Sequence, residues 1–213
     1  MPTEPTVPIT EDEEVAEVPA KLDLYSYIRW RDIKQGILRI GDIEQCLVEI
    51  AISELREMRR LGLKKIRVFL MSPGGEIYSS LGLYDALQGL VKAGIEVEVT
   101  VYGYAASAAA MTVLQAGTSR RALPNSRFLL HEPRRWKLLA AERVSELEDE
   151  TKEMKVLEAT IVGILSERCK QPRKKVAALF KRKEVWMSAL EAKDWGLIDE
   201  IIESEEKIET TTS

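Results

Sequence analysis

VEVTVYGYAASAAAM, residues 97–111, is the stretch that decides the fold. Its first six residues are mostly Val, Thr and Tyr, which predicts a strand over residues 97–102. The small residues that follow predict a helix over residues 106–116. Ser107 is therefore expected directly after a strand and in the first turn of a helix.

Strands and helices alternate on both sides of this segment. Further strands are predicted at residues 36–43 (GILRIGDI, a strand and a turn), 65–71 (KIRVFLM) and 127–130 (RFLL). Helices are predicted at residues 44–61 and at about 139–169, with two shorter ones after that. Another helix is marked by Leu83, Ala86, Leu87 and Leu90 and ends at Gly94. This order implies right-handed crossovers, so the predicted fold class is α/β with a mostly parallel sheet layered with helices.

The two ends of the chain differ in composition from its body. Residues 1–20 hold four of the eight prolines and six acidic residues, with no Lys or Arg, and residues 204–213 (SEEKIETTTS) are similarly polar. Such segments bury too little apolar area to offset chain entropy. We therefore expect a flexible acidic tail over residues 1–20, a folded domain over residues 21–203 and a flexible tail over residues 204–213.

The composition of the body excludes several classes of protein. A chain of 213 residues, 45% of them hydrophobic, suits one domain. The formal net charge of −4 becomes +2 when the six acidic residues of the N-terminal tail are set aside, so we expect no nucleic-acid partner. Cys46 and Cys169 have neither disulfide-framework nor metal-ligand spacing, so we expect no metal and no cofactor. With no apolar run of about 18 residues and no secretory signal, a cytoplasmic protein without a membrane partner is expected.

Ser107 is the first candidate for chemistry. The N–H groups at a helix start are unpaired and the helix dipole is positive there, so a negative oxygen forming beside Ser107 would be stabilised. The alanines around it let another backbone approach closely. The alternative is that Ser107 simply caps the helix.

His131 is the second candidate and the only histidine of the chain. An imidazole can take a proton from a serine at neutral pH and return it to a leaving group. Ser107 and His131 both follow predicted strands, and functional groups gather at the carboxyl ends of parallel strands. The alternative is a structural histidine at a strand end.

The SPGG segment, residues 72–75, follows the predicted strand at residues 65–71. Its two glycines permit a sharp turn whose amide groups face outward, as an anion-binding loop requires. An ordinary β-turn has the same composition. Together with a serine at a helix start, the loop can supply a second donor for an oxyanion.

Four segments in order resemble the signature segments of Clp protease proteolytic subunits. They are SPGGEIYSSLGLYDAL, GYAASAAAMTVLQAG, ALPNSRFLLHEP and WMSALEAKDWGLIDEI, and the resemblance covers about residues 36–203. It implies a crotonase-like fold of repeated ββα turns, with layered parallel sheets and a protruding handle helix. It also implies a homo-oligomer of stacked heptameric rings that hydrolyses peptides or unfolded proteins inside a chamber, with an AAA+ unfoldase as partner.

The resemblance assigns roles residue by residue. It makes Ser107 the nucleophile, His131 the base, and the backbone N–H groups of Gly75 and Ala108 the oxyanion donors. The aspartate that completes the family's triad corresponds here to Glu184, one methylene longer, which can still orient an imidazole. The alternative for Glu184 is a solvent-facing charge beside the basic residues 181–183.

A second departure from the family follows His131. Residues 134–147, RRWKLLAAERVSEL, replace the glycine-rich stretch that aligns substrate and joins the two rings in the family. How substrate is held, and whether two rings stack, stay open at this point.

Three functions remain in competition. The leading hypothesis is a serine endopeptidase that works through an acyl-enzyme. The second is a Clp-like subunit with impaired catalysis and a structural or regulatory role, suggested by Glu184 and the altered segment after His131. The third is an acyl-CoA enzyme of the crotonase class, which shares the fold and the pair of oxyanion amides but needs no Ser and His at these positions.

Overall fold

The computed structural model describes residues 23–132, 144–180 and 184–204. The predicted tails, apart from Ser204, lie outside the described residues, and so do residues 133–143, directly after His131 and Glu132. The predicted domain, residues 21–203, begins two positions before the first described residue.

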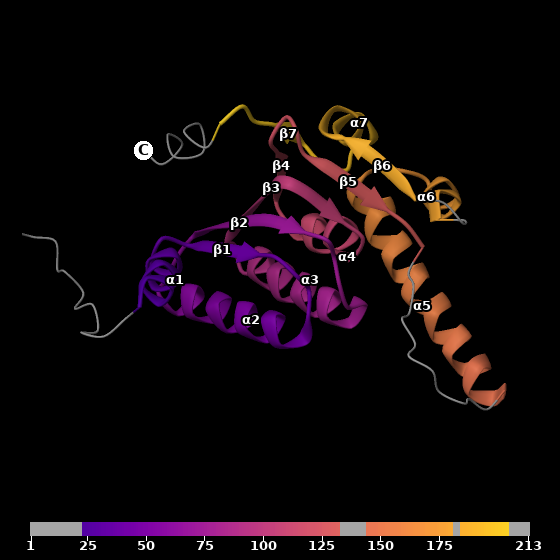
Figure 1. Ribbon diagram of the computed structural model, residues 1–213, viewed down its shortest axis with the longest axis horizontal. Helices are drawn as coiled ribbons and strands as arrows, with labels where there is room; N and C mark the ends of the chain where they lie inside the picture. Colours follow the sequence, from indigo (N-terminus) through magenta and orange to yellow (C-terminus); the bar gives the residue numbers. More distant parts are fainter. Residues whose placement is uncertain (1–22, 133–143, 181–183, 205–213) are drawn as a thin grey trace, which may run out of the picture.

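The described residues form a mixed α/β fold around a single sheet (Figure 1). The strands are β1 (Ile37–Ile40), β2 (Lys65–Ser72), β3 (Glu96–Ala106), β4 (Ser119–Ala122), β5 (Arg127–Leu130), β6 (Val185–Ser188) and β7 (Glu200–Ile201). The helices are α1 (Leu24–Lys34), α2 (Gln45–Arg60), α3 (Ile77–Lys92), α4 (Ala108–Met111), α5 (Val144–Arg168), α6 (Arg173–Phe180) and α7 (Ala189–Trp195), with a 3₁₀ turn, η1 (Val113–Ala116).

The sheet is parallel except at one edge. The strand order is β1-β2-β3-β4-β7, with β5 paired to β3, and β6 paired antiparallel to β5. The first part of β3 pairs with β4, and its last part, Tyr104 to Ala106, pairs with β5. Gly103, at φ 67°, lies between the two parts. The mostly parallel α/β fold is therefore confirmed, and β3 is long enough to join two sets of neighbouring strands in one hydrogen-bonded sheet.

The core lies between the sheet and two helices. Figure 1 shows α2 and α3 lying together along one face of β1, β2 and β3. Every second side chain of β2 is completely buried on this face, as are the α3 residues that pack in the same core: Ile66, Val68, Leu70, Leu83 and Leu87. The alternation of β2 and the helical spacing of α3 thus produce one continuous apolar layer.

The segment around Ser107 differs from its predicted structure. The strand continues to Ala106, and the helix begins at Ala108 and ends after one turn at Met111. Thr112 leaves the helical conformation, with φ −125° and ψ −68°, and its hydroxyl donates to the Ala108 carbonyl at 2.6 Å. The Thr112 N–H donates to the same carbonyl at 2.9 Å, and such back-bonding by a threonine hydroxyl often bends a helix. The predicted helix divides at this position into α4 and η1.

The long helix and the two short ones are present as α5, α6 and α7. The part of α5 nearest its N-terminus extends away from the sheet (Figure 1). No helix in the described ranges combines the length and apolar composition that a membrane crossing requires.

The C-terminal elements are tied to the core by a buried arginine. Arg120, 5% exposed, donates through Nε to Asp199 at 3.0 Å and through Nη1 to Gln115 at 2.8 Å. Burial would by itself raise the pKa of the Asp199 carboxyl, but the hydrogen bonds from Arg120 hold that pKa below its ordinary value. The ionised pair therefore anchors β7 beside β4.

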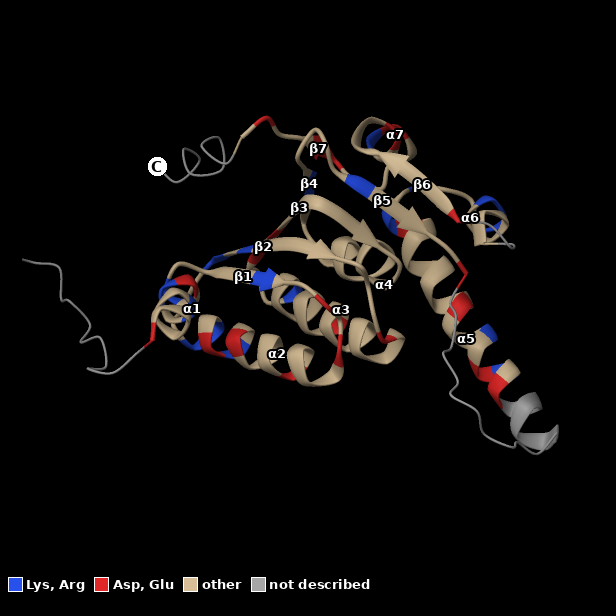
Figure 2. Cartoon of the chain, in the orientation of Figure 1, with Lys and Arg blue, Asp and Glu red and all other residues tan. Residues whose placement is uncertain are grey.

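Charges of both signs lie close together elsewhere in the molecule. Glu98, 1% exposed, lies 3.1 Å from Lys65 Nζ and 2.8 Å from Arg121 Nη1. Figure 2 also shows acidic and basic residues together on α2 and on the described part of α5. The buried Glu98 carboxylate is compensated by the cations of Lys65 and Arg121, as a buried charge requires.

The two cysteines should differ in reactivity. Burial raises the pKa of the Cys169 thiol to about 11, whereas Cys46 is exposed. Because the thiolate is the nucleophile, iodoacetamide at about pH 8 should modify Cys46 and spare Cys169 in the native protein, and modify both in denaturant. Peptide mass spectrometry measures the two sites, and rapid native labelling of Cys169 would show that its burial is wrong.

Candidate active site

Ser107 occupies a strained turn between β3 and α4. Its φ of 55° and ψ of −130° lie where a residue with a Cβ is rarely found. Its N–H donates to the Leu129 carbonyl of β5 at 2.8 Å, which holds the turn against the neighbouring strand. Such strain persists only where the surroundings impose it, and a sharp strand-to-helix turn is the local geometry that exposes a nucleophilic serine in hydrolases.

The SPGG loop packs directly against this turn. A Cβ placed on Gly74 would lie 2.7 Å from Ser107 Cβ and 2.7 Å from the Ala106 carbonyl oxygen, so only glycine fits there. The φ of Gly74, 97°, also favours glycine. The Ser72 hydroxyl accepts from the Gly74 N–H at 3.0 Å, which fixes the turn from within.

A residue that the sequence did not single out holds the loop from outside. Ile43, fully buried, donates its N–H to the Gly74 carbonyl at 3.0 Å and accepts from the Glu76 N–H at 2.8 Å. A Cβ on Gly75 would overlap the main chain of Ile43. Only the position of Ile43 at the end of the predicted strand and turn hinted at this contact, because its partners lie about thirty residues further along the chain.

Gly75 and Ala108 belong to two segments that meet at Ser107, the loop after β2 and the first turn of α4. The same Cβ placed on Gly74 would come within 3.1 Å of the Ala108 nitrogen, so the loop and the first turn of α4 adjoin. Among the main-chain hydrogen bonds between described residues, neither the Gly75 nor the Ala108 N–H is a donor. Both amides can therefore serve as donors to an oxygen bound beside Ser107.

His131 emerges at the same edge of the sheet as Ser107. β3 and β5 are parallel, with Ala106 opposite Leu129, so each residue follows its strand at nearly the same level. Neighbouring strands lie about 4.8 Å apart, so Ser107 and His131 follow two adjacent strands of the sheet. The imidazole Nδ1 lies 2.7 Å from the main-chain oxygen of Glu132.

Glu184 directly precedes β6, which runs antiparallel to β5. Leu130 is opposite Val185, and extending this register by one position sets His131 opposite Glu184. Side chains of opposite residues lie on the same face of a sheet, about 5 Å apart at Cβ. The family resemblance links Glu184 to His131, but no local pattern predicts that their segments pair, because β6 is a strand of only four residues.

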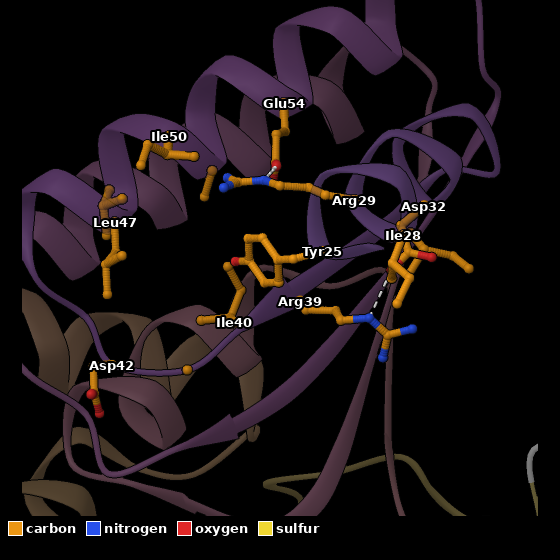
Figure 3. A pocket seen from close by; sticks show the side chains of 14 residues that line it. Tyr25, Ile28, Arg29, Asp32, Arg39, Ile40, Asp42, Leu47, Ile50 and Glu54 are labelled. Carbon is orange, nitrogen blue, oxygen red and sulfur yellow. Dashed lines mark hydrogen bonds and ion pairs between the residues drawn. The ribbon is translucent and has the colours of Figure 1, made fainter. Parts of the chain in front are cut away.

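A separate cavity lies between α1, β1 and α2 (Figure 3). Its volume is about 240 Å³, and Tyr25, Leu47 and Ile50 contribute apolar surface to it. Arg29 pairs with Glu54 and Arg39 pairs with Asp32 along its wall. None of the predicted site residues lines this cavity.

Known proteins resemble this chain over most of its length. A family model described as Clp protease matches residues 29–205, a range that includes all of the predicted site residues. The ATP-dependent Clp protease proteolytic subunit 2 of Chlamydia pneumoniae is 33% identical over 196 residues, which cover 90% of this chain and 91% of that protein. Subunit 3 of Rhizobium etli is 33% identical over 82% of this chain and 87% of its own, and subunit 2 of Chlamydia abortus is 34% identical over 86% and 85%.

Gly74→Ala tests the close approach of the loop to Ser107. The added Cβ meets main-chain atoms at a positive φ, so we expect the free energy of unfolding to fall by about 1–3 kcal/mol. Gly89→Ala is the matched control, since Gly89 lies in α3 with nothing within 4 Å of an added Cβ. That change should raise the free energy of unfolding by about 0.5–1 kcal/mol. Urea denaturation measures both, and equal effects would contradict the packing described.

Proposed function

Because this chain belongs to the Clp protease family, we propose that it is a serine endopeptidase with Ser107 as nucleophile and His131 as general base. The single observation that carries the proposal is the strained turn of Ser107, bonded to β5 two residues before His131. A serine held at a positive φ beside a glycine loop is difficult to explain as a helix cap, and its side chain makes no capping hydrogen bond in α4.

The proposed reaction proceeds through an acyl-enzyme. Ser107 Oγ attacks the peptide carbonyl while His131 Nε2 takes the hydroxyl proton. The carbonyl oxygen becomes an oxyanion that the N–H groups of Gly75 and Ala108 stabilise. His131 returns the proton to the departing amine, and a water molecule then cleaves the ester by the same steps in reverse. The two amides belong to elements held by Ile43 and by α4, so they need not reorganise during the reaction.

Glu184 is proposed as the acidic member of the site. The register of β5 and β6 supports this role, since it sets Glu184 opposite His131. A carboxylate near the imidazole stabilises the imidazolium that forms when Ser107 loses its proton. The glutamate has one more methylene than the family's aspartate and can span a correspondingly longer gap.

The proposed assembly is a homo-oligomeric chamber of heptameric rings that admits peptides or unfolded proteins. Several relatives are named as ATP-dependent, which supports an AAA+ unfoldase as partner. We also propose that the crotonase-like plan extends to this chain, with α5 as the handle between rings and with the cytoplasm as its location. The extension of α5 away from the sheet supports the handle (Figure 1).

A subunit with impaired catalysis is the second candidate. The glutamate in place of the family's aspartate favours it. The altered segment at residues 134–147 bears on it too, but residues 134–143 lie outside the described residues. Because the matching family model is that of Clp proteases, the acyl-CoA alternative has no support.

Ser107→Ala decides between the two candidates. Loss of the nucleophile should lower the hydrolysis of short fluorogenic peptides by at least about 10³-fold. It should also abolish labelling by a fluorophosphonate probe. Ser53→Ala, on the exposed side of α2, is the matched control and should leave both unchanged. Equal activity of wild type and Ser107→Ala would remove the peptidase proposal.

A further inference from the structure

The contact of His131 with its own backbone has a chemical consequence. Nδ1 of the imidazole lies 2.7 Å from the main-chain oxygen of Glu132, the next residue along the chain. A carbonyl oxygen has no proton to donate, so a hydrogen bond at this distance requires that Nδ1 carry the proton. Nε2 is then the unprotonated nitrogen of the neutral ring, as a general base for Ser107 requires.

In a serine triad the carboxylate has two tasks. It accepts from Nδ1–H, which fixes the tautomer and the ring orientation, and its charge stabilises the imidazolium. The Glu132 carbonyl can perform the first task completely because it can only accept. It performs the second only in part, through its dipole. The two tasks can therefore belong to different groups in this chain.

The position of Glu184 suits the second task better than the first. The residue is exposed and lies at the end of a four-residue edge strand. Its side chain has more rotamers than an aspartate, and water screens its charge. A long carboxylate on an exposed residue can add to the local potential, but it orients a ring less well than a carbonyl that is fixed by the adjoining peptide unit.

We propose that the main-chain carbonyl of Glu132, and not the carboxylate of Glu184, fixes the Nδ1–H tautomer of His131. The carbonyl is a positioning group, Ser107 and His131 act as a dyad, and Glu184 contributes charge alone. This inference rests on the proposed peptidase function for its kinetic consequence. Its tautomer can be measured without any activity.

The direct test is the imidazole spectrum. His131 is the only histidine, so ¹⁵N-histidine labelling of the full chain yields one pair of ring nitrogen signals. At a pH where the ring is neutral, Nδ1 should give the protonated signal and Nε2 the unprotonated one, in wild type and in Glu184→Gln alike. An Nε2–H tautomer in wild type, or a switch of tautomer in Glu184→Gln, would overturn the proposal.

The kinetic test uses the same variant. Glu184→Gln should lower kcat/KM for a fluorogenic peptide by less than about fivefold, the size expected from an exposed charge. If Glu184 held the tautomer, the loss would approach about 10⁴-fold. Glu49→Gln, an exposed glutamate on α2, is the matched control and should have no effect.

A pair of substitutions addresses the carbonyl itself. Glu132→Ala and Glu132→Gly both retain the main-chain oxygen, but glycine frees the peptide unit that carries it. We expect Glu132→Gly to lower kcat several-fold more than Glu132→Ala, with KM little changed. Equal kcat values for the two variants would count against the proposal. If wild type shows no hydrolysis that depends on Ser107, the peptidase function fails, and the spectrum alone then decides the tautomer.

Discussion

The close approach of Gly74 to Ser107 is the constraint on which the arrangement of the site depends. The loop after β2 and the turn after β3 meet with no room for a Cβ between them. The loop is held by Ile43 on one side, and the turn is held by Leu129 on the other. The strained turn at Ser107 is therefore held between β5 and a loop that is itself anchored, and the Gly75 and Ala108 amides, which we propose as oxyanion donors, belong to these two held segments.

The length of β3 connects the core to this site. Its first half lies in the middle of the sheet, where Val97, Val99 and Val101 are fully buried against the helices. Its second half passes Gly103 and pairs with β5, which leads to His131. One strand thus supplies a rigid base for the turn at Ser107 and aligns the strand that carries the imidazole. Groups placed on rigid elements keep a geometry that a loop alone would lose.

The electrostatics of the site differ from those of the buried charges elsewhere. The buried Glu98 is compensated by Lys65 and Arg121, and the buried Arg120 is compensated by Asp199. Around His131 the described contact is with a neutral carbonyl, and the nearest acidic candidate along the register is exposed. A carbonyl oxygen brings no formal charge to the imidazole. In the mechanism we propose, the orientation of His131 is therefore separate from the stabilisation of its charged form.

The sequence by itself determined the candidates and most of the long elements. The α/β class and the positions of β2, α2, β5 and α5 follow from local periodicity, and Ser107, His131 and the glycines of SPGG are identified by residue type and by their place after strands. Only the tertiary structure decided the conformation of Ser107, the anchoring role of Ile43, and the pairing of β5 with β6. The short strands β4, β6 and β7 were missed for the same reason. Their hydrogen-bond partners lie far away along the chain, so no local pattern of side chains could reveal the pairing that makes them strands.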